Sequence, residues 1–196
     1  MTDKTAVLEY LHRHLDDKRL RHVFGVRDLA VHLARRHGAD PEAAELAALL
    51  HDCAKWMPLE EQLAACEAFG ISLTPEDRLQ PSVLHAYVGA AIAQKRFGAP
   101  EPVVQAIRAH TTGWDPMGLL DRVLYVADFS EPNRSYPQAE QVRTLAEEDL
   151  TGATIVAMTH KLRSLLDRGR PIHPRTVAAR NRLLLERAES ATQEES

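Results

Sequence analysis

Cysteine is scarce in this sequence: the 196 residues include only two, Cys53 and Cys66. Two cysteines cannot form the disulfide framework that staples small secreted proteins. The first residues, Met-Thr-Asp-Lys-Thr-Ala, also lack the layout of a signal peptide, which has a basic stretch followed by an apolar one. We therefore expect the protein to work in a reducing cytoplasm.

Long apolar runs and an excess of positive charge are missing as well. The longest uncharged, mostly apolar run, from Ala86 to Ala93, is far shorter than the roughly 20 residues of a membrane-spanning helix. The formal net charge is −4, which provides no general attraction to nucleic acid or anionic lipid. We expect neither as a partner, and an anionic substrate would need a local basic site.

Runs with the two-residue period of β-strands are not convincing anywhere in the chain. Helical spacing between glycine and proline residues instead predicts an all-α helical bundle, with one domain over 1–188 and a polar, disordered tail over 189–196. A strand is the alternative for Leu119 to Asp128. A break near Gly152 is the alternative for the long helix over Gln138–Asp167. The expected helices are Thr5–Leu15, Lys18–His37, one that starts at Asp40-Pro41 and carries His51 and Asp52, Pro58–Phe69, Ser82–Phe97, Pro100–His110, Leu119–Asp128, Gln138–Asp167 and Thr176–Ala188.

The stretch from Glu45 to Trp56 combines a buried helix with two adjacent polar residues. Between Leu46 and Ala54, only His51 and Asp52 are strongly polar. A helix that is apolar on every side is buried, and a buried carboxylate is costly unless it is paired or binds a cation. We interpret the pair as part of a metal site; the alternative is a buried His–Asp hydrogen bond that only supports packing.

Six groups share this placement on, or at the end of, an apolar helical face. Metal-binding bundles draw their ligands from facing helices in this way, and imidazole with carboxylate suits iron, manganese or zinc. One shared metal site accounts for all six together, and the other histidines in helical stretches, His12, His14, His32, His37 and His160, are interpreted as surface or packing residues. The six candidate metal ligands are His22, His51, Asp52, His85, His110 and Asp128.

The spacing His22…His51-Asp52…Asp128 resembles the metal signature of the HD superfamily of phosphohydrolases, and His85 and His110 match the subset that holds a second metal. Four local segments are more specific and resemble the YqeK family, the bacterial HD-type symmetrical hydrolases of diadenosine tetraphosphate. The resemblance runs from about Arg21 to Asn181. The four segments are His51-Asp-Cys-Ala-Lys-Trp-Met-Pro58, His110-Thr-Thr-Gly113, Ala127-Asp-Phe-Ser-Glu-Pro-Asn-Arg134 and Ile172-His-Pro-Arg-Thr-Val-Ala-Ala-Arg-Asn181.

This resemblance implies an all-helical HD fold with an iron centre, for which manganese or another divalent transition metal is the alternative. The implied substrate is a dinucleoside polyphosphate, with diadenosine tetraphosphate cut in the middle to two ADP. By motif, His22, His51, Asp52 and Asp128 would be the principal ligands. His85 and His110 would hold a second metal or contact the phosphates.

The chemistry of phosphate hydrolysis agrees with these residues. A bound cation lowers the pKa of its water and so provides a hydroxide nucleophile. We expect Asp52, Lys55 and His85 to be catalytic and Arg134 to clamp a phosphate. The full set expected to bind substrate is His22, Lys55, His85, His110, Thr111, Arg134, Ile172, His173, Arg175 and Thr176.

Alternatives stay open for residues and for function. Lys55 could be a solvated cation at a helix end, Arg134 could pair only with Glu131, and His173 could be an ordinary loop residue. The protein could be another HD enzyme that acts on nucleoside mono- or triphosphates, or a nucleotide sensor without catalysis. The sequence also leaves a homodimer open.

Overall fold

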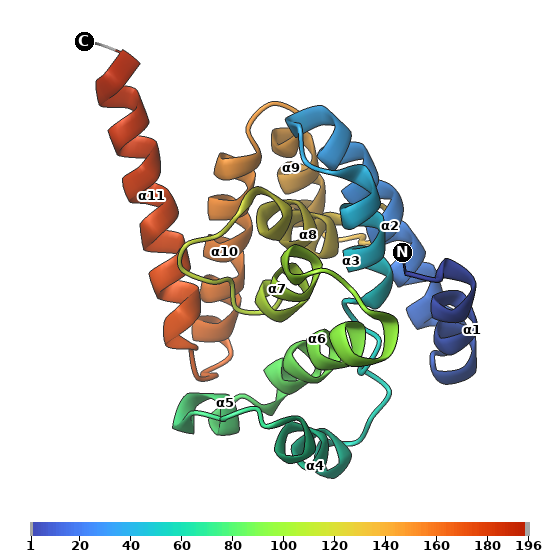
Figure 1. Cartoon of the computed structure of the whole chain (residues 1–196). Coiled ribbons are helices and arrows are strands. Elements are labelled where there is room, and N and C mark those ends of the chain that lie inside the picture. The colour runs from blue at the N-terminus through green and yellow to red at the C-terminus, as the bar shows by residue number, and fades with distance from the viewer. Residues whose placement is uncertain (1, 195–196) are drawn as a thin grey trace.

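The computed structural model describes residues 2–194, and these residues form helices and no β-strand (Figure 1). The predicted all-α fold class is confirmed, and α8 excludes the strand alternative for Leu119 to Asp128. The elements are α1 (Lys4–His14), α2 (Asp17–His37), α3 (Pro41–Leu50), α4 (Leu59–Phe69), α5 (Pro75–Leu79), the 3₁₀ turn η1 (Pro81–Val83), α6 (Leu84–Phe97), α7 (Glu101–Ala109), α8 (Leu119–Ser130), α9 (Pro137–Ala146), α10 (Leu150–Asp167) and α11 (Pro174–Glu194).

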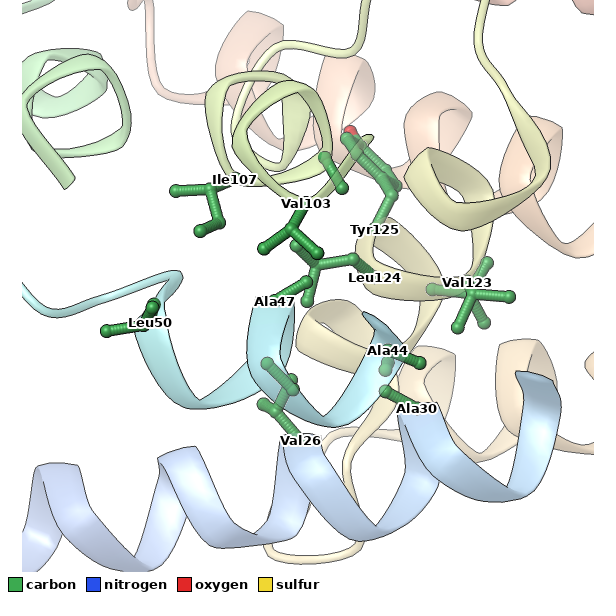
Figure 2. Packing of buried hydrophobic residues seen from close by; sticks show 14 of the residues in the cluster. Val26, Ala30, Ala44, Ala47, Leu50, Val103, Ile107, Val123, Leu124 and Tyr125 are labelled. Atoms are coloured by element: carbon green, nitrogen blue, oxygen red, sulfur yellow. The ribbon is translucent and has the colours of Figure 1, made fainter. Parts of the chain in front are cut away.

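The short helix α3 lies at the centre of the core, in contact with α2, α7 and α8. Figure 2 shows Ala44 and Ala47 of α3 among side chains of the surrounding helices, such as Val26 of α2 and Leu124 of α8. Ala47 and Leu50 have no exposed surface. The alanine side chains are short, so the neighbouring helices pack closely against α3, and the turn that follows α3 is buried with it.

The end of α3 determines where His51 and Asp52 lie. The helix ends at Leu50, and both residues belong to the buried turn that follows it. Asp40 begins the helix by accepting a hydrogen bond from the backbone N–H of Glu42 at 2.9 Å, as expected for an N-cap followed by proline.

The long helix predicted over 138–167 is divided into α9 and α10. The break lies at residues 147–149, just before Gly152, because the Asp149 carboxylate accepts a hydrogen bond from the backbone N–H of Gly152 at 2.7 Å and so caps α10. This break turns α10 back along α9 and α8, where it forms one wall of the candidate site.

Helix α11 continues to Glu194, past Ala188, where the sequence predicted the domain to end. Residues 189–194 are therefore helical, whereas a disordered tail was predicted over 189–196; residues 195 and 196 lie outside the described residues. The extension has no glycine or proline that would end a helix. Helix α11 packs on α10, with Ala179 and Leu183 fully buried, and ion pairs of Glu186 with Arg122 and of Arg187 with Asp149 hold it further along. Its C-terminal end projects outward (Figure 1).

None of the helices within residues 2–194 combines the length and the apolar character of a membrane-spanning segment.

Candidate metal centre

The six candidate metal ligands meet in one place, although they come from five separate parts of the chain. His22 lies on α2, His51 and Asp52 follow α3, His85 lies on α6, His110 ends α7 and Asp128 lies on α8. Donor atoms of five of them form two groups, His22–His51–Asp52 and Asp52–His85–His110, and within each group all donor atoms lie within 4.8 Å of one another. The sixth ligand, Asp128, lies beside the first group, with Oδ1 3.1 Å from Nε2 of His22 and 3.9 Å from Nε2 of His51. Asp52 belongs to both groups.

Asp52 lies between the two groups and turns one carboxylate oxygen toward each. Its Oδ1 lies 3.1 Å from Nε2 of His85 and 3.8 Å from Nε2 of His110. Its Oδ2 lies 3.7 Å from Nε2 of His51 and 3.9 Å from Nε2 of His22. Asp52 would therefore be able to contribute one oxygen to a cation held by either group.

The backbone orients three of the histidine rings. In His51, His85 and His110, Nδ1 donates a hydrogen bond to the carbonyl oxygen three residues earlier, at 2.6, 2.7 and 2.6 Å respectively. Because Nδ1 carries the proton, the lone pair of Nε2 points to the interior of the cluster. Metal-binding histidines are held by such outer hydrogen bonds, which fix the tautomer and the ring direction.

This arrangement of nitrogen lone pairs fits a cation. Nε2 of His22 lies 3.4 Å from Nε2 of His51, and Nε2 of His85 lies 3.2 Å from Nε2 of His110. In His85 and His110 the proton is on Nδ1, so their two Nε2 atoms repel each other, and an anionic oxygen of Asp52 lies beside them. A divalent transition metal would replace this repulsion with coordination, and the nitrogen and oxygen donors are those that such metals bind.

The fourth histidine, His22, is oriented by a carboxylate that the sequence analysis did not assign to the site. Nδ1 of His22 lies 3.2 Å from Oε1 of Glu131, and Nε2 lies 3.1 Å from Oδ1 of Asp128. Gly25, one turn further along α2, leaves room for Glu131, because a Cβ atom there would collide with Oε2 of the carboxylate. The signal for Glu131 was its place in the segment Ala127–Arg134.

Four of the six candidate ligands have the protonation states that metal binding requires. Burial opposes ionisation of Asp52 and Asp128, but the histidines around them hold the pKa of both carboxyl groups well below the usual range. Burial lowers the pKa of His51, and burial together with neighbouring histidines lowers the pKa of His110 to about 3. The two carboxylates and the neutral forms of His51 and His110 are therefore present at neutral pH, as coordination needs. The pKa of His22 is raised instead, because its hydrogen bonds to Asp128 and Glu131 outweigh the effect of burial.

A cavity of about 370 Å³, here called the first cavity, opens above the cluster. Four cationic side chains and two aspartates line it, which supplies the local positive charge that a protein of net charge −4 needs to bind phosphate. Eight of the predicted site residues line it, namely Asp52, Lys55, His85, His110, Thr111, Asp128, Arg134 and Thr176.

Lys55 and Arg134 both lie against the cluster. Nζ of Lys55 lies 3.2 Å from both ring nitrogens of His85, so its ammonium group points into the site. Nη2 of Arg134 lies 3.1 Å from Oδ1 of Asp128, whereas its Nε lies 3.9 Å from Glu131. The Nε atom of Arg134 is buried without a hydrogen-bond partner.

Ile172, His173 and Arg175 do not line the first cavity. Nε2 of His173 lies 3.0 Å from Oδ1 of the buried Asp77, which ties the loop before α11 to α5. The guanidinium of Arg175 lies 4.9 Å from the ring centre of Trp114 and contacts Tyr87. Of the four residues predicted to bind substrate between positions 172 and 176, only Thr176, in the first turn of α11, reaches the cavity.

Two basic residues in the first cavity were not predicted from the sequence. Nη1 of Arg19 lies 2.7 Å from Oδ2 of Asp52. Lys161 of α10 donates a hydrogen bond to the carbonyl oxygen of Thr111, and burial lowers its pKa to about 8. Both lie in ordinary amphipathic stretches, so no local pattern distinguishes them from surface cations.

Comparison with protein families identifies the class of this fold and site. The family model of the HD domain matches residues 19–132, which include all six candidate ligands. The chain therefore belongs to the HD domain family.

Comparison with individual proteins places the chain more narrowly. A symmetrical bis(5'-nucleosyl)-tetraphosphatase of Halalkalibacterium halodurans is 40% identical over 94% of this chain and 98% of its own length. The protein of the same name in Bacillus subtilis is 38% identical over 93% of this chain and 98% of its own length. The chain belongs with the symmetrical bis(5'-nucleosyl)-tetraphosphatases, as the resemblance predicted, and it is a hydrolase.

A solved structure agrees with this assignment. A predicted HD superfamily hydrolase involved in NAD metabolism, from Clostridium acetobutylicum, superimposes with a TM-score of 0.91 and is 37% identical. The match covers 95% of this chain and 99% of that protein, so the likeness extends well beyond residues 19–132.

Proposed function

We propose that this protein hydrolyses diadenosine tetraphosphate symmetrically: one water molecule adds across the central phosphoanhydride bond, and two molecules of ADP leave. The observation that carries the proposal is the cluster of four histidines and two aspartates beneath a basic cavity. The names of the H. halodurans and B. subtilis relatives support the substrate and the position of the cut.

The metal that we propose is iron, with manganese or another divalent transition metal as the alternative. His22, His51, Asp52 and Asp128 would hold the first ion, and His85 and His110 would hold a second ion or contact the phosphates. Such an ion lowers the pKa of water at the site and withdraws charge from the phosphate oxygens.

The side chains around the cluster bind and orient the phosphate chain. The ammonium group of Lys55 lies beside the His85 ring in the first cavity. It would neutralise negative charge on the leaving diphosphate. Arg134 offers a guanidinium whose Nε has no partner, and the hydroxyl of Thr111 is likewise buried without one. Unpartnered donors beside a cavity are suited to phosphate oxygens.

One nucleoside would lie at the far end of the first cavity, where Thr176 lines the wall. We also propose that Ile172, His173 and Arg175 contribute to substrate binding indirectly, by positioning Thr176. His173 contacts Asp77 and Arg175 packs on Trp114, so these residues would fix the start of α11, where Thr176 lies.

The test is product analysis on protein purified without chelator. Incubation with diadenosine tetraphosphate should yield ADP as the sole product, and activity should disappear on chelation and return with iron or manganese. Inorganic phosphate or tripolyphosphate from other nucleotides would support a different HD enzyme. Tight nucleotide binding without turnover in fully metallated protein would support a sensor.

We predict that Asp52→Ala abolishes hydrolysis and leaves the helical fold intact, because the substitution removes the carboxylate shared by both ligand groups. Circular dichroism and product analysis measure the two effects. His32→Ala is the control, since His32 is exposed, pairs with Glu147 and lines neither the cluster nor the first cavity. Retained activity in Asp52→Ala would contradict the proposal.

We further propose that the protein works in a reducing cytoplasm, since Cys53 and Cys66 are both buried and free. A homodimer stays open as its assembly, and light scattering on the purified protein distinguishes it from a monomer.

A further inference from the structure

We propose that a second cavity, between α8 and α10, binds the second nucleoside of the substrate. The inference rests on the proposed function and deepens it: the protein would bind each adenosine diphosphate half in its own cavity, on either side of the metal cluster. The second cavity adjoins the first, and most of its lining residues do not line the first cavity.

The second cavity has a volume of about 770 Å³, within the range of roughly 300–1,000 Å³ that is common for small-molecule sites. It runs along α8, the start of α9 and the outer half of α10. Four residues line both cavities: His110, Asp128, Arg134 and Lys161. The cluster and its cationic side chains therefore lie where the two cavities meet.

Symmetrical cleavage requires two binding spaces that meet at the metal cluster. The bond that breaks joins the two central phosphates, so equal halves of the substrate must extend from the metal cluster in two directions. The first cavity, about 370 Å³, accommodates one half. The other half needs a space that continues from the same phosphate-binding residues, and the second cavity provides it.

Aromatic side chains form the wall of the second cavity. The ring of Phe129 lies nearly parallel to that of His160, with 18° between the planes and 6.4 Å between the centres. Tyr136 meets Phe129 edge-on at 5.6 Å. Nucleobases stack on such ring faces, whatever the base, and one stacked base contributes roughly 1–3 kcal/mol in nucleic-acid-binding proteins. His160, interpreted from the sequence as a surface or packing residue, is part of this wall.

Polar groups in the cavity also lack partners. The hydroxyl of Tyr125 is buried beside the cavity and has no hydrogen-bond partner, although Tyr125 is only 2% exposed. Buried hydroxyls are nearly always paired, so this one points to a ligand or water. Arg163 and Arg168 line the outer part and add positive charge beyond that of Arg134 and Lys161.

A third cavity does not meet the same conditions. It has a volume of about 370 Å³ and contains Trp114, Tyr87 and Arg175, but none of its lining residues lines the first or the second cavity. The phosphate chain of one substrate molecule could not run from the cluster directly into it.

The test uses one substitution that fills the second cavity and one that removes an aromatic ring from its wall, both at positions where we expect the fold to be retained. Ser164 is exposed on α10, so Ser164→Trp places a large side chain in the cavity, and His160→Ala removes one ring of its wall. Leu166→Trp is the matched control, because Leu166 is 64% exposed on the same helix and lines neither cavity. Circular dichroism verifies that each variant is folded.

Two substrates are compared in metal-loaded protein: diadenosine tetraphosphate and adenosine 5'-tetraphosphate, which has one nucleoside. We expect Ser164→Trp and His160→Ala to lower kcat/KM for the first about tenfold, mostly through KM, and to change it less than about twofold for the second. Calorimetry should find two ADP per chain in the wild type and Leu166→Trp, and one in Ser164→Trp.

Equal losses on both substrates, no loss on either, or a single ADP site in the wild type would overturn the second nucleoside site. A wild type that forms no ADP from diadenosine tetraphosphate would instead overturn the proposed function. The two failures are therefore distinguishable.

Discussion

At the scale of single residues, the site depends on groups that do not touch substrate. Glu131 holds Nδ1 of His22 at 3.2 Å, and Gly25 leaves the space that this carboxylate occupies. A methyl group on Gly25 would lie 2.8 Å from Nδ2 of Asn133 and collide with the end of Glu131. Because the end of a glutamate side chain is flexible, the carboxylate would move and the helix would stay.

We therefore predict that Gly25→Ala weakens metal binding by about 10–100-fold without unfolding the protein, since loss of such an outer hydrogen bond typically has this effect. Competition with a chelator of known affinity measures it. Gly89→Ala is the control within α6, where the nearest neighbours of the new methyl group lie 3.5 Å away, an ordinary contact. Equal metal affinity in both variants would refute the role of Gly25.

At the scale of elements, α8 carries both a metal ligand and an unusual cap. The helix begins after Gly118, whose backbone N–H donates a hydrogen bond to Oδ2 of Asp121 at 2.9 Å. Burial raises the pKa of Asp121 to about 6, against the effect of that hydrogen bond. The folded state thus binds the Asp121 proton more tightly than the unfolded state does.

The free energy of unfolding therefore depends on pH through Asp121, and the contribution of Asp121 falls as the pH rises. The stabilisation from protonated Asp121 is complete below about pH 4 and is lost as the pH rises through about 6. We predict that Asp121→Asn becomes more stable relative to wild type between pH 4 and 7, by as much as about 3 kcal/mol. Urea unfolding across this range measures it, with Asp3→Asn, an exposed N-cap on α1, as the control. A difference that does not vary with pH would contradict the prediction.

At the scale of the whole molecule, the cluster joins α2, the turn after α3, α6, α7 and α8. Without a cation, the Nε2 lone pairs of His85 and His110 face each other at 3.2 Å inside the core. A metal that binds only the folded chain stabilises all these elements at once, because unfolding must release it.

We predict that manganese or iron at about 100 times its dissociation constant stabilises the protein by about 2.7 kcal/mol, and raises Tm by roughly 5–10 °C. Differential scanning calorimetry before and after chelation measures this shift. Asp52→Ala should show almost none of it. The same Tm with and without metal in the wild type would exclude the cluster as a metal site.

Much of this arrangement follows from the sequence. Neighbouring residues in the sequence determine where a helix begins and ends, because helices depend on periodic apolar faces and on caps such as Asp40 with Pro41. The candidate ligands could be selected because polar residues such as His51 and Asp52 stand out on apolar faces. The end of α11 was missed because the last polar residues resemble a tail, although nothing in them ends a helix.

The sequence by itself therefore determined the all-α class, most of the helices and the six candidate ligands, since each depends on spacing along one stretch of chain. Tertiary structure alone decided which groups surround them. Glu131 reaches His22 across 109 positions, and Lys161 reaches Thr111 across 50. The second cavity likewise exists only because α10 folds back beside α8. Contacts over such separations depend on packing, which no local pattern encodes.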